Sequence, residues 1–152
     1  MADDVTGKVK EVKLSENVEE YLEQLLVFEE NGDTLVRISQ VSEGLGISPP
    51  SAVQMLKKLE ARGLVNYRRR EGVQLTEEGR RVATQIIRNH RLIETLMKTT
   101  LEKDVDENVV CGLEHHMTKE FADAICTLLN HPRTCPHGNQ IPGGECCTRK
   151  NR

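Results

Sequence analysis

The sequence has no long hydrophobic run, since none of its apolar stretches reaches the roughly eighteen residues that a membrane-spanning helix needs. It also lacks the basic start and following apolar block of a secretory signal peptide. A disulfide framework is not expected, because the five cysteines are odd in number and no secretory signal accompanies them. We therefore expect a cytoplasmic protein with no membrane partner, whose cysteines are free thiols or metal ligands.

Neither sign of charge dominates the chain, whose formal net charge is −3. The charge is nevertheless unevenly distributed. Residues 54–91 hold ten basic and four acidic side chains, whereas residues 1–30 hold nine acidic and three basic ones, and residues 92–152 nine acidic and seven basic ones. A basic segment between acidic ones favours a localised anionic partner, although a solvated helix face is the other explanation.

The first half of the sequence predicts three helices and a hairpin. Apolar residues at helical spacing place the helices at Ser15–Glu30, around Val36–Gly44 and at about Pro50–Arg62. The segments "LVNYRRR" and "GVQLT", joined through Glu71-Gly72, read as a β-hairpin. Three helices with a tight turn, followed by a hairpin, are typical of a winged helix-turn-helix, which implies binding to double-stranded DNA and not catalysis.

This interpretation assigns roles to two groups of residues. The second helix of a helix-turn-helix enters the major groove with its N-terminal residues facing the bases. The candidates there are small or hydrogen-bonding, and they are Ser48, Pro50, Ser51 and Gln54. The candidates for phosphate contacts are Lys57 and Lys58 on the same helix and Arg68, Arg69 and Arg70 on the wing. The simpler alternatives are that Ser48 only caps its helix and that the arginines only lie in solvent at the hairpin tip.

The second half of the sequence predicts further helices. Thr76 caps a long helix, and the apolar face of this helix continues to Met97, beyond what a lone winged helix needs. Two more helices are expected, one at about Asp106–His116 and one within "FADAICTLLNH". These elements predict a second, dimer-forming segment.

The stretch "CGLEHH" at residues 111–116 gathers residues that ligate metals. Cys111, Glu114 and His115 stand at i, i+3 and i+4 and so project together from one helix. Sulfur, oxygen and nitrogen donors together suit a divalent transition ion. Alone, Cys111 is more simply a buried thiol and His115 a hydrogen-bonded imidazole. Together with His90 and Glu94, another i, i+4 pair, they favour a metal site, which the acidic first helix is placed to complete.

The order of a winged helix, "NHRLIE", "CGLEHH" and "HPRTCPHGNQIPGG" resembles the diphtheria toxin repressor family of metal-dependent transcriptional repressors. The resemblance covers about Ser15 to Gly144. It implies a homodimer that binds Fe(II) or Mn(II), docks on a palindromic operator and represses metal-uptake genes, with no room for the family's SH3-like domain. The fold class expected is mainly α, with a winged helix-turn-helix at 15–76, a helical dimerisation and metal-binding domain at 77–144, and a Cys-containing tail at 145–152.

The resemblance also implies the ligands. Those carried over are Glu20, Glu23, His90, Glu94, Glu107, Cys111, Glu114 and His115. The set is a hybrid, because Cys111 matches the iron-responsive branch, whereas Glu20 and Glu23 match the manganese-responsive one and Glu107 replaces a histidine of the iron branch. A thiolate favours softer ions and carboxylates favour hard ones. Fe(II) is the first expectation, Mn(II) the alternative, and Co(II), Ni(II) or Zn(II) are surrogates.

Other interpretations remain open at this stage. Cys135-Pro136-His137 and Cys146-Cys147 form either a loop with adventitious thiols or a further structural or redox-sensing site, and Cys126 is expected in the core. A metallohydrolase would need a general base or nucleophile beside an open metal position, and no such motif is present, so we expect neither an enzyme nor a small-molecule substrate. A constitutive winged-helix protein with a merely structural metal set is the remaining rival.

Overall fold

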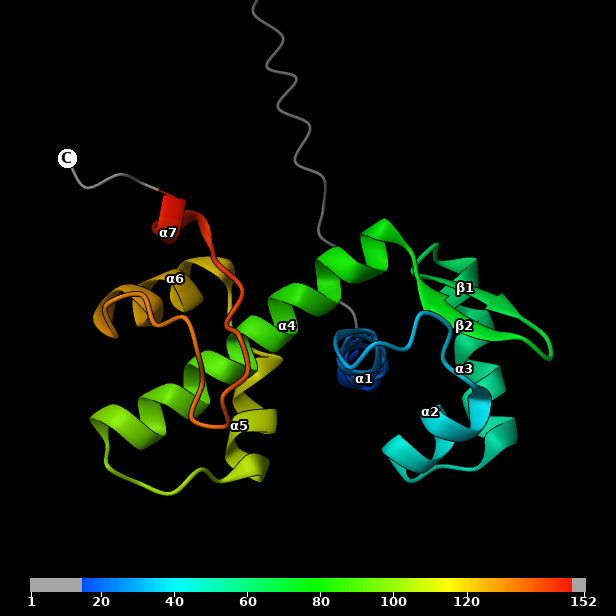
Figure 1. The fold of residues 1–152 in the computed structure, drawn as a ribbon, viewed down its shortest axis with the longest axis horizontal. Coiled ribbons are helices and arrows are strands. Elements are labelled where there is room, and N and C mark those ends of the chain that lie inside the picture. The colour runs from blue at the N-terminus through cyan, green and yellow to red at the C-terminus, as the bar shows by residue number, and fades with distance from the viewer. Residues whose placement is uncertain (1–14, 149–152) are drawn as a thin grey trace, which may run out of the picture.

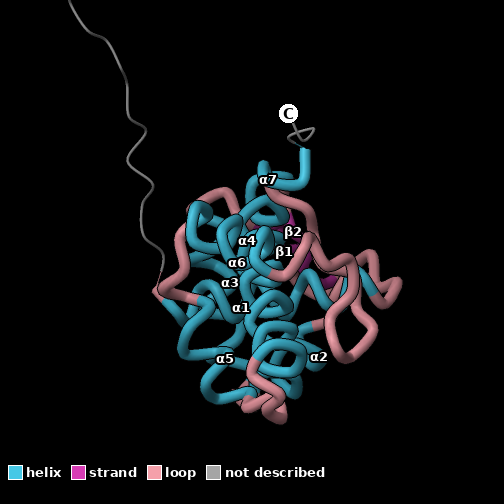
Figure 2. The backbone as a smooth tube through the Cα atoms, turned by 90° about the vertical axis from the view of Figure 1, so that its left-hand side faces the viewer, coloured by secondary structure: helices cyan, strands magenta, loops and turns pink. Residues whose placement is uncertain are grey.

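The structure is a computed structural model that describes residues 15–148, so residues 149–152 of the expected tail lie outside the described part. The elements in chain order are α1 (Glu16–Glu30), α2 (Ile38–Leu45), α3 (Pro49–Ala61), β1 (Val65–Arg68), β2 (Gly72–Leu75), α4 (Glu77–Thr95), the π-helical turn η1 (Leu96–Thr100), α5 (Glu107–Glu114), α6 (Lys119–Leu128) and α7 (Glu145–Thr148). Figure 1 shows α4 running diagonally between two lobes, and Figure 2 shows the same chain from the side. The mainly helical fold class is confirmed.

Side-chain oxygens cap four of the helices. Ser48 precedes α3, Thr76 precedes α4, Asp106 precedes α5 and Thr118 precedes α6, and each accepts a hydrogen bond from a backbone amide of the first turn. The caps expected from Ser48 and Thr76 are thus confirmed. Ser15 stands at the N-cap position of α1, but its side chain makes no capping hydrogen bond.

The N-terminal lobe is built around one apolar cluster. Leu22 and Leu25 of α1, Val41 of α2 and Leu56 of α3 are fully buried there. On α3, Ala52 and Leu59 are also buried, while Val53 is half-buried. The three helices and the hairpin form the winged helix-turn-helix that the apolar spacing predicts.

The wing is a two-stranded antiparallel hairpin in which Val65 pairs with Leu75 and Arg68 with Gly72. Val36 adds a short bridge to Val73, with 2.8 Å hydrogen bonds in both directions. Gly72 has a φ of 138°, and a Cβ at this position would lie 2.5 Å from the carbonyl oxygen of Val36. Only glycine therefore lets the segment before α2 approach the wing at the strand pair next to its turn.

The long helix α4 joins the two lobes. Its Ala83 and Ile87 belong to the N-terminal apolar cluster, whereas Leu92 and Ile93 belong to a second cluster with residues of α5 and α6. The helix changes to the π-helical turn η1 after Thr95, whose hydroxyl bonds back to the carbonyl of the preceding turn. Among residues 15–148, no helix has both the length and the apolar character needed to cross a membrane.

Two arginines of the basic segment are structural. Arg88 is 2% exposed and donates from Nη2 to Asp123 Oδ1 at 2.7 Å and from Nε to the Pro142 carbonyl at 3.1 Å. Arg91 is also buried and pairs with Glu30 of α1. Because these two side chains are used inside the protein, the charge available to an outside partner is smaller than the sequence count indicates.

Candidate metal centre and nucleic-acid surface

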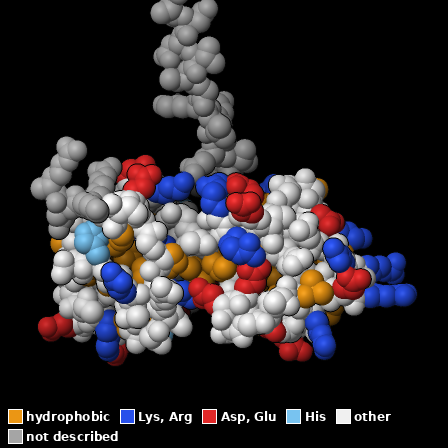
Figure 3. All heavy atoms as spheres, turned by 45° about the horizontal axis from the view of Figure 1, so that its top comes forward, with side chains coloured by type: hydrophobic (Ala, Val, Ile, Leu, Met, Phe, Trp, Pro, Cys, Tyr) orange, Lys and Arg blue, Asp and Glu red, His pale blue; other side chains and the backbone are white. Residues whose placement is uncertain are grey.

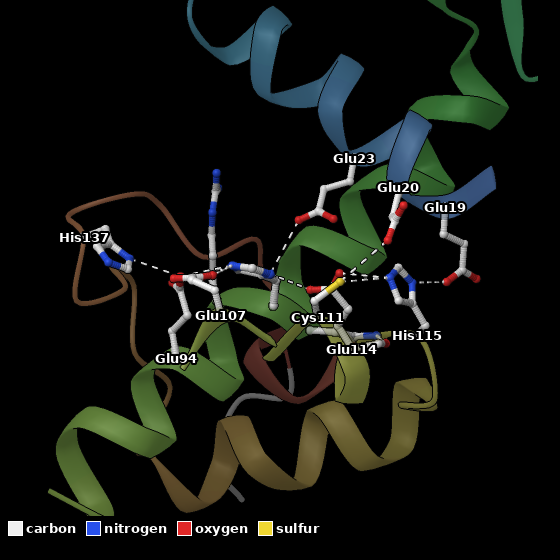
Figure 4. Close-up of polar contacts among 12 residues, drawn as sticks. Glu19, Glu20, Glu23, Glu94, Glu107, Cys111, Glu114, His115 and His137 are labelled. Carbon is white, nitrogen blue, oxygen red and sulfur yellow. Dashed lines mark hydrogen bonds and ion pairs between the residues drawn. The ribbon is translucent and has the colours of Figure 1, made fainter. Parts of the chain in front are cut away.

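The candidate metal ligands meet where α1, α4 and α5 pack together (Figure 4). Each element contributes part of the set. The contributions are Glu20 and Glu23 from α1, His90 and Glu94 from α4, Glu107, Cys111 and Glu114 from α5, and His115 from the residue directly after α5. The structure therefore brings all eight candidates to one region, where six of them form two neighbouring clusters and Glu23 and Glu114 group with His90 between these.

Glu20, Cys111 and His115 form the first cluster, in which the potential ligand atoms all lie within 4.8 Å of one another. The sulfur of Cys111 is 3.8 Å from Oε1 of Glu20 and 3.8 Å from Nε2 of His115. The other ring nitrogen, Nδ1 of His115, lies 2.6 Å from Oε2 of Glu19. That contact orients the imidazole so that Nε2 points at the cluster.

His90, Glu94 and Glu107 form the second cluster. His90 Nε2 lies 3.0 Å from Glu94 Oε1 and 3.4 Å from Glu107 Oε2. Glu94 also faces the loop after α6, because its Oε1 is 3.1 Å from Nδ1 of His137. Glu94, Cys135 and His137 are close enough to form a ligand group of their own.

Glu114 connects the two clusters. It is 1% exposed, with one carboxylate oxygen in contact with His90 Nδ1 and the other 3.1 Å from His115 Nε2. Glu23 approaches the same place from α1, with its Oε1 3.6 Å from His90 Nδ1. Glu20 and Glu23 were both expected as ligands, and they face different places, since Glu20 meets Cys111 and Glu23 meets His90 and Glu114.

Burial and mutual repulsion shift the pKa values of this region. Burial, followed by the nearby charges of Glu114 and Glu20, raises the pKa of the Cys111 thiol to about 11. Burial and the charge of Glu114 raise the pKa of Glu23 to about 7. Burial alone would lower the pKa of His90, but hydrogen bonds to Glu114 and Glu94 outweigh it and raise this pKa to about 10. Without a cation, the site holds protons because its negative charges repel one another.

The donor set fits a divalent transition metal. Ligand bonds of about 2.0 to 2.3 Å put the donor atoms of one ion within roughly 4.6 Å of each other, close to the spread of each cluster. The first cluster offers sulfur, oxygen and nitrogen, and the second offers nitrogen and two carboxylates. Oxygen and nitrogen donors with a single thiolate suit Fe(II) and its neighbours better than Ca²⁺ or Mg²⁺.

The candidate DNA-contacting residues lie on the surface of the other lobe. Figure 3 shows Lys and Arg side chains projecting at the end of the molecule where the hairpin lies. All of the candidates are exposed, namely Ser48, Pro50, Ser51, Gln54, Lys57, Lys58, Arg68, Arg69 and Arg70. Arg68 makes only a solvent-exposed pair with Glu71 at 3.4 Å. Ser48 is both exposed and the cap of α3, so it does cap its helix, and its contact with DNA stays a prediction.

Comparison with known proteins gives a family for this arrangement. Residues 13–73 match "Iron dependent repressor, N-terminal DNA binding domain", and residues 76–143 match "Iron dependent repressor, metal binding and dimerisation domain". The chain belongs to the iron-dependent repressor family. This family consists of transcriptional repressors and not of enzymes, in agreement with the expectation from the missing catalytic motif.

Individual members of the iron-dependent repressor family share about a third of the residues. The chain is 33% identical over 133 residues to the iron-dependent repressor IdeR of Mycobacterium tuberculosis (strain ATCC 25618 / H37Rv). This match covers 86% of this chain and 57% of the relative. It is 33% identical over 132 residues to the diphtheria toxin repressor of Corynebacterium diphtheriae, a match that covers 86% of this chain and 58% of that repressor. A solved manganese-dependent transcriptional repressor in complex with manganese has a TM-score of 0.76 at 30% identity, covering 84% of this chain and 60% of that one. The chain thus spans less than two thirds of these relatives.

In this family member, the structure adds residues that the sequence did not assign to the site. Glu19 was considered only as one of the acidic side chains of the first helix, yet it orients His115. Asn89 was missed and donates to the backbone carbonyl of Glu114 at 3.0 Å, which fixes the end of α5. One signal was available, since Glu19 is adjacent to Glu20, but the Asn89 contact depends on how α4 packs on α5.

The cysteines of the C-terminal part separate into two places. The sequence allowed Cys135 and His137 to share one site with Cys146 and Cys147. That pairing is wrong, because Cys135 and His137 group with Glu94, while Cys146 and Cys147 lie elsewhere. Cys126 is buried, as expected.

Proposed function

We propose that this protein is a metal-dependent transcriptional repressor that binds palindromic operator DNA as a homodimer when loaded with Fe(II), and that it controls metal-uptake genes in the cytoplasm. The observation that carries the proposal is the composition of the first cluster. Glu20 comes from the segment that matches a DNA-binding domain, whereas Cys111 and His115 come from the segment that matches a metal-binding domain. One ligand group therefore links the two functional units.

The link works through charge and position. Glu20 and Glu23 on α1 face Glu107 and Glu114 on α5 across the clusters, so the carboxylates of the two units repel each other. A bound divalent cation supplies the positive charge that offsets this repulsion. Glu20 and Cys111 are then held together, and α1 fixes the winged helix relative to α5. The reading helices of a dimer acquire one spacing, which matches the two half-sites of an operator.

Fe(II) is our first choice of metal and Mn(II) the alternative. The thiol of Cys111 favours Fe(II) and its softer neighbours, because hard Mn(II) prefers oxygen donors. The carboxylates of Glu20, Glu94 and Glu107 are acceptable to both ions. Co(II), Ni(II) and Zn(II) are expected to act as surrogates in vitro. The named relatives include both iron-dependent and manganese-dependent repressors, so the donor chemistry carries this choice.

The dimer surface lies on α5 and α6. Val109 and Leu113 of α5 and Phe121 and Leu128 of α6 are large apolar side chains that this protomer exposes. Exposed apolar side chains of this size gain stability when a second copy covers them. We therefore place the two-fold axis at these helices and the division between the DNA-binding and dimerisation units at 76/77, as the sequence predicts.

Residues of α3 and of the wing are expected to make different contacts with DNA. Ser51 and Gln54 are placed to read base edges in the major groove, since they are exposed at the start of α3. Lys57, Lys58 and the wing arginines are placed for phosphates, where they set register and affinity but read no sequence.

The proposal is tested by DNA binding with controlled metal. A binding sequence is first selected from random duplexes in the presence of Fe(II) under anaerobic conditions, and affinity is then followed by fluorescence anisotropy with Fe(II), Mn(II), Zn(II) or chelator. We expect at least tenfold tighter binding with Fe(II) than with chelator, and loss of this difference in Glu114→Ala. Equal binding with Fe(II) and chelator would instead identify a constitutive winged-helix protein.

A further inference from the structure

A further group of possible metal ligands lies apart from the first and second clusters, which we call the sensor clusters. It shares no member with them. It consists of Cys126 on α6, His131 in the loop after α6, and Cys146 and Cys147 on α7. The α7 turn and α5 lie at opposite ends of the C-terminal lobe (Figures 1 and 2). The family arrangement of the sensor therefore does not account for these four residues.

Four distances within this group match the edges of a tetrahedron of metal ligands. Cys147 Sγ lies 3.6 Å from Cys126 Sγ, 3.7 Å from Cys146 Sγ and 3.6 Å from His131 Nδ1, and the Cys126 sulfur is also 3.6 Å from that nitrogen. A tetrahedral zinc ion with bonds of about 2.3 Å to sulfur and about 2.0 Å to nitrogen sets sulfur–sulfur edges of about 3.8 Å and sulfur–nitrogen edges of about 3.5 Å. Four contacts in the group agree with these values to a few tenths of an ångström.

The backbone is shaped to bring the four residues together. Asn130 and His131 have φ values of 59° and 54°, a left-handed conformation that non-glycine residues rarely adopt. This reversal after α6 turns His131 back toward Cys126, whose carbonyl accepts the amide of His131 at 2.8 Å. A Cβ on Gly144 would lie 2.3 Å from Asp123 Oδ1 and 2.4 Å from Arg88 Nη2, so a side chain there would disturb the Arg88–Asp123 pair that lies beside α7.

A buried positive charge faces the group. Nη2 of Arg88 lies 3.4 Å from the sulfur of Cys146, and this side chain is 2% exposed. Three thiolates and one neutral imidazole around a divalent cation carry a net charge of −1, and Arg88, which also pairs with Asp123, donates toward one of these thiolates. Nη2 of Arg88 also donates to Asp123, and Nε donates to the Pro142 carbonyl. The arginine thus connects α4, α6 and the segment that leads to α7.

We propose that Cys126, His131, Cys146 and Cys147 form a structural Zn(II) site that fastens the C-terminal segment to α6, independently of the sensor metal. Four protein ligands with three sulfurs close the coordination of zinc and leave no open position, as in structural sites. A disulfide is the rival use of these cysteines. It would need two sulfurs at about 2.0 Å, which no pair of cysteines in the described residues shows.

Variants that change one site at a time distinguish zinc bound at the structural site from metal bound at the sensor clusters. The full chain is purified under reducing conditions, its regulatory metal is removed with a mild chelator, and the retained zinc is measured by mass spectrometry of the metals. We expect one zinc per chain in the wild type and in Cys111→Ser, which alters only the sensor. We expect less than a tenth of that in Cys147→Ser, whose side chain is exposed and whose folding is followed by circular dichroism.

Cobalt substitution gives a second readout of the geometry. Co(II) in Cys111→Ser is expected to show the intense visible bands of tetrahedral coordination and a sulfur-to-metal charge-transfer band, both much weaker in the double variant Cys111→Ser/His131→Ala. The variant His131→Cys offers four thiolates and is expected to restore the tetrahedral bands. Zinc-free reduced protein that is fully folded would overturn the proposal. So would unchanged zinc content in both Cys147→Ser and His131→Ala, or native protein lighter by two hydrogens through a Cys126–Cys147 disulfide.

Discussion

Oε1 of Glu20 lies 3.8 Å from the sulfur of Cys111, although 91 positions separate the two residues in the sequence. Glu20 is on the first helix of the DNA-binding unit and Cys111 on the helix that carries the sensor ligands. The contact joins two candidate ligands of one cluster, so occupancy of that cluster would act directly on the winged helix. The first prediction follows from it.

Substituting Glu20→Gln keeps the size of the side chain and removes its charge. We expect metal affinity to fall by about tenfold to a hundredfold, because one ligand of the first cluster is weakened while Cys111 and His115 remain. The metal concentration needed for DNA binding should rise by the same factor. Glu43→Gln, an exposed carboxylate on α2, is the matched control. A wild-type metal response in Glu20→Gln would show that α1 does not take part in sensing.

Replacing Cys111 tests the choice of metal. In Cys111→Glu, a hard carboxylate replaces the thiolate, so Mn(II) should activate DNA binding at lower concentrations and Co(II) at higher ones. We expect the ratio of the two activation midpoints to change by at least tenfold. Cys111→Ser is the control, since it removes the thiolate without supplying a carboxylate and should weaken both ions. An unchanged ratio in Cys111→Glu would mean that position 111 does not set selectivity.

The pKa shifts predict how the stability of the metal-free protein depends on pH. The pKa of Glu23 is raised from 4.5 to about 7, so folding favours its neutral form, and stability is lost as the pH rises from about 4.5 to 7. The pKa of His90 is raised from 6.5 to about 10, so its contribution is complete below 6.5 and is lost as the pH rises toward 10. Melting temperatures in chelator should therefore fall between pH 5 and pH 9.

The same titration identifies the groups responsible. Glu23→Gln should flatten the decline between pH 4.5 and 7 and leave the decline above it, since His90 is retained. Bound metal replaces protons on these ligands, so the metal-induced rise in melting temperature should grow with pH. A metal-free melting temperature that rises from pH 5 to pH 9 by the same amount in wild type and variant would contradict the assignment.

Two substitutions separate phosphate contacts from base reading. Arg69→Ala on the wing should weaken binding to all duplexes about equally and lower the slope of log affinity against log salt by about one. Gln54→Ala on α3 should leave the slope unchanged and cost about 1–3 kcal/mol on the selected operator, with relaxed specificity at one base pair. Both are measured by anisotropy at several salt concentrations. A reduced salt slope in Gln54→Ala together with an unchanged one in Arg69→Ala would reverse these roles.

The packing of the wing against the segment before α2 depends on one glycine. Gly72→Ala places a Cβ against the carbonyl of Val36 in a backbone conformation that disfavours side chains, so we expect a loss of about 1–3 kcal/mol in the free energy of unfolding. Chemical denaturation measures it. Gly112→Ala is the control, because a Cβ there meets no atom within 4 Å and alanine favours a helix. A Gly72→Ala variant as stable as the wild type would contradict the described packing of the wing.

Much of the fold was predictable because its signals are local. Thr76 caps α4, and Cys111, Glu114 and His115 fall on one side of α5, through chemistry and spacing within a single turn of helix. The assignment of Glu20 and Glu23 to different clusters was not predictable, since both lie on the inner side of α1. That choice depends on the rotation of α1 against α4 and α5, which many weak side-chain contacts set together.

Two further features were hidden for tertiary reasons. Arg88 counts toward the basic segment in the sequence, yet it is buried against Asp123, 35 positions away. The group of Cys126, His131, Cys146 and Cys147 depends on the left-handed backbone after α6 and on the close approach at Gly144. Neither a charge count nor a ligand spacing reveals contacts that a loop reversal creates.

The central claim is that metal and operator binding are coupled through the contact of α1 with α5. Coupling of this kind is reciprocal, so the operator must tighten metal binding by the same factor by which metal tightens operator binding. The most direct measurement is therefore the Fe(II) dissociation constant, determined anaerobically by competition with a chromophoric chelator, with and without saturating operator. The account predicts at least tenfold tighter Fe(II) binding in the presence of the operator, and a much smaller change in Glu20→Gln. Identical Fe(II) affinity with and without operator in the wild type would contradict it.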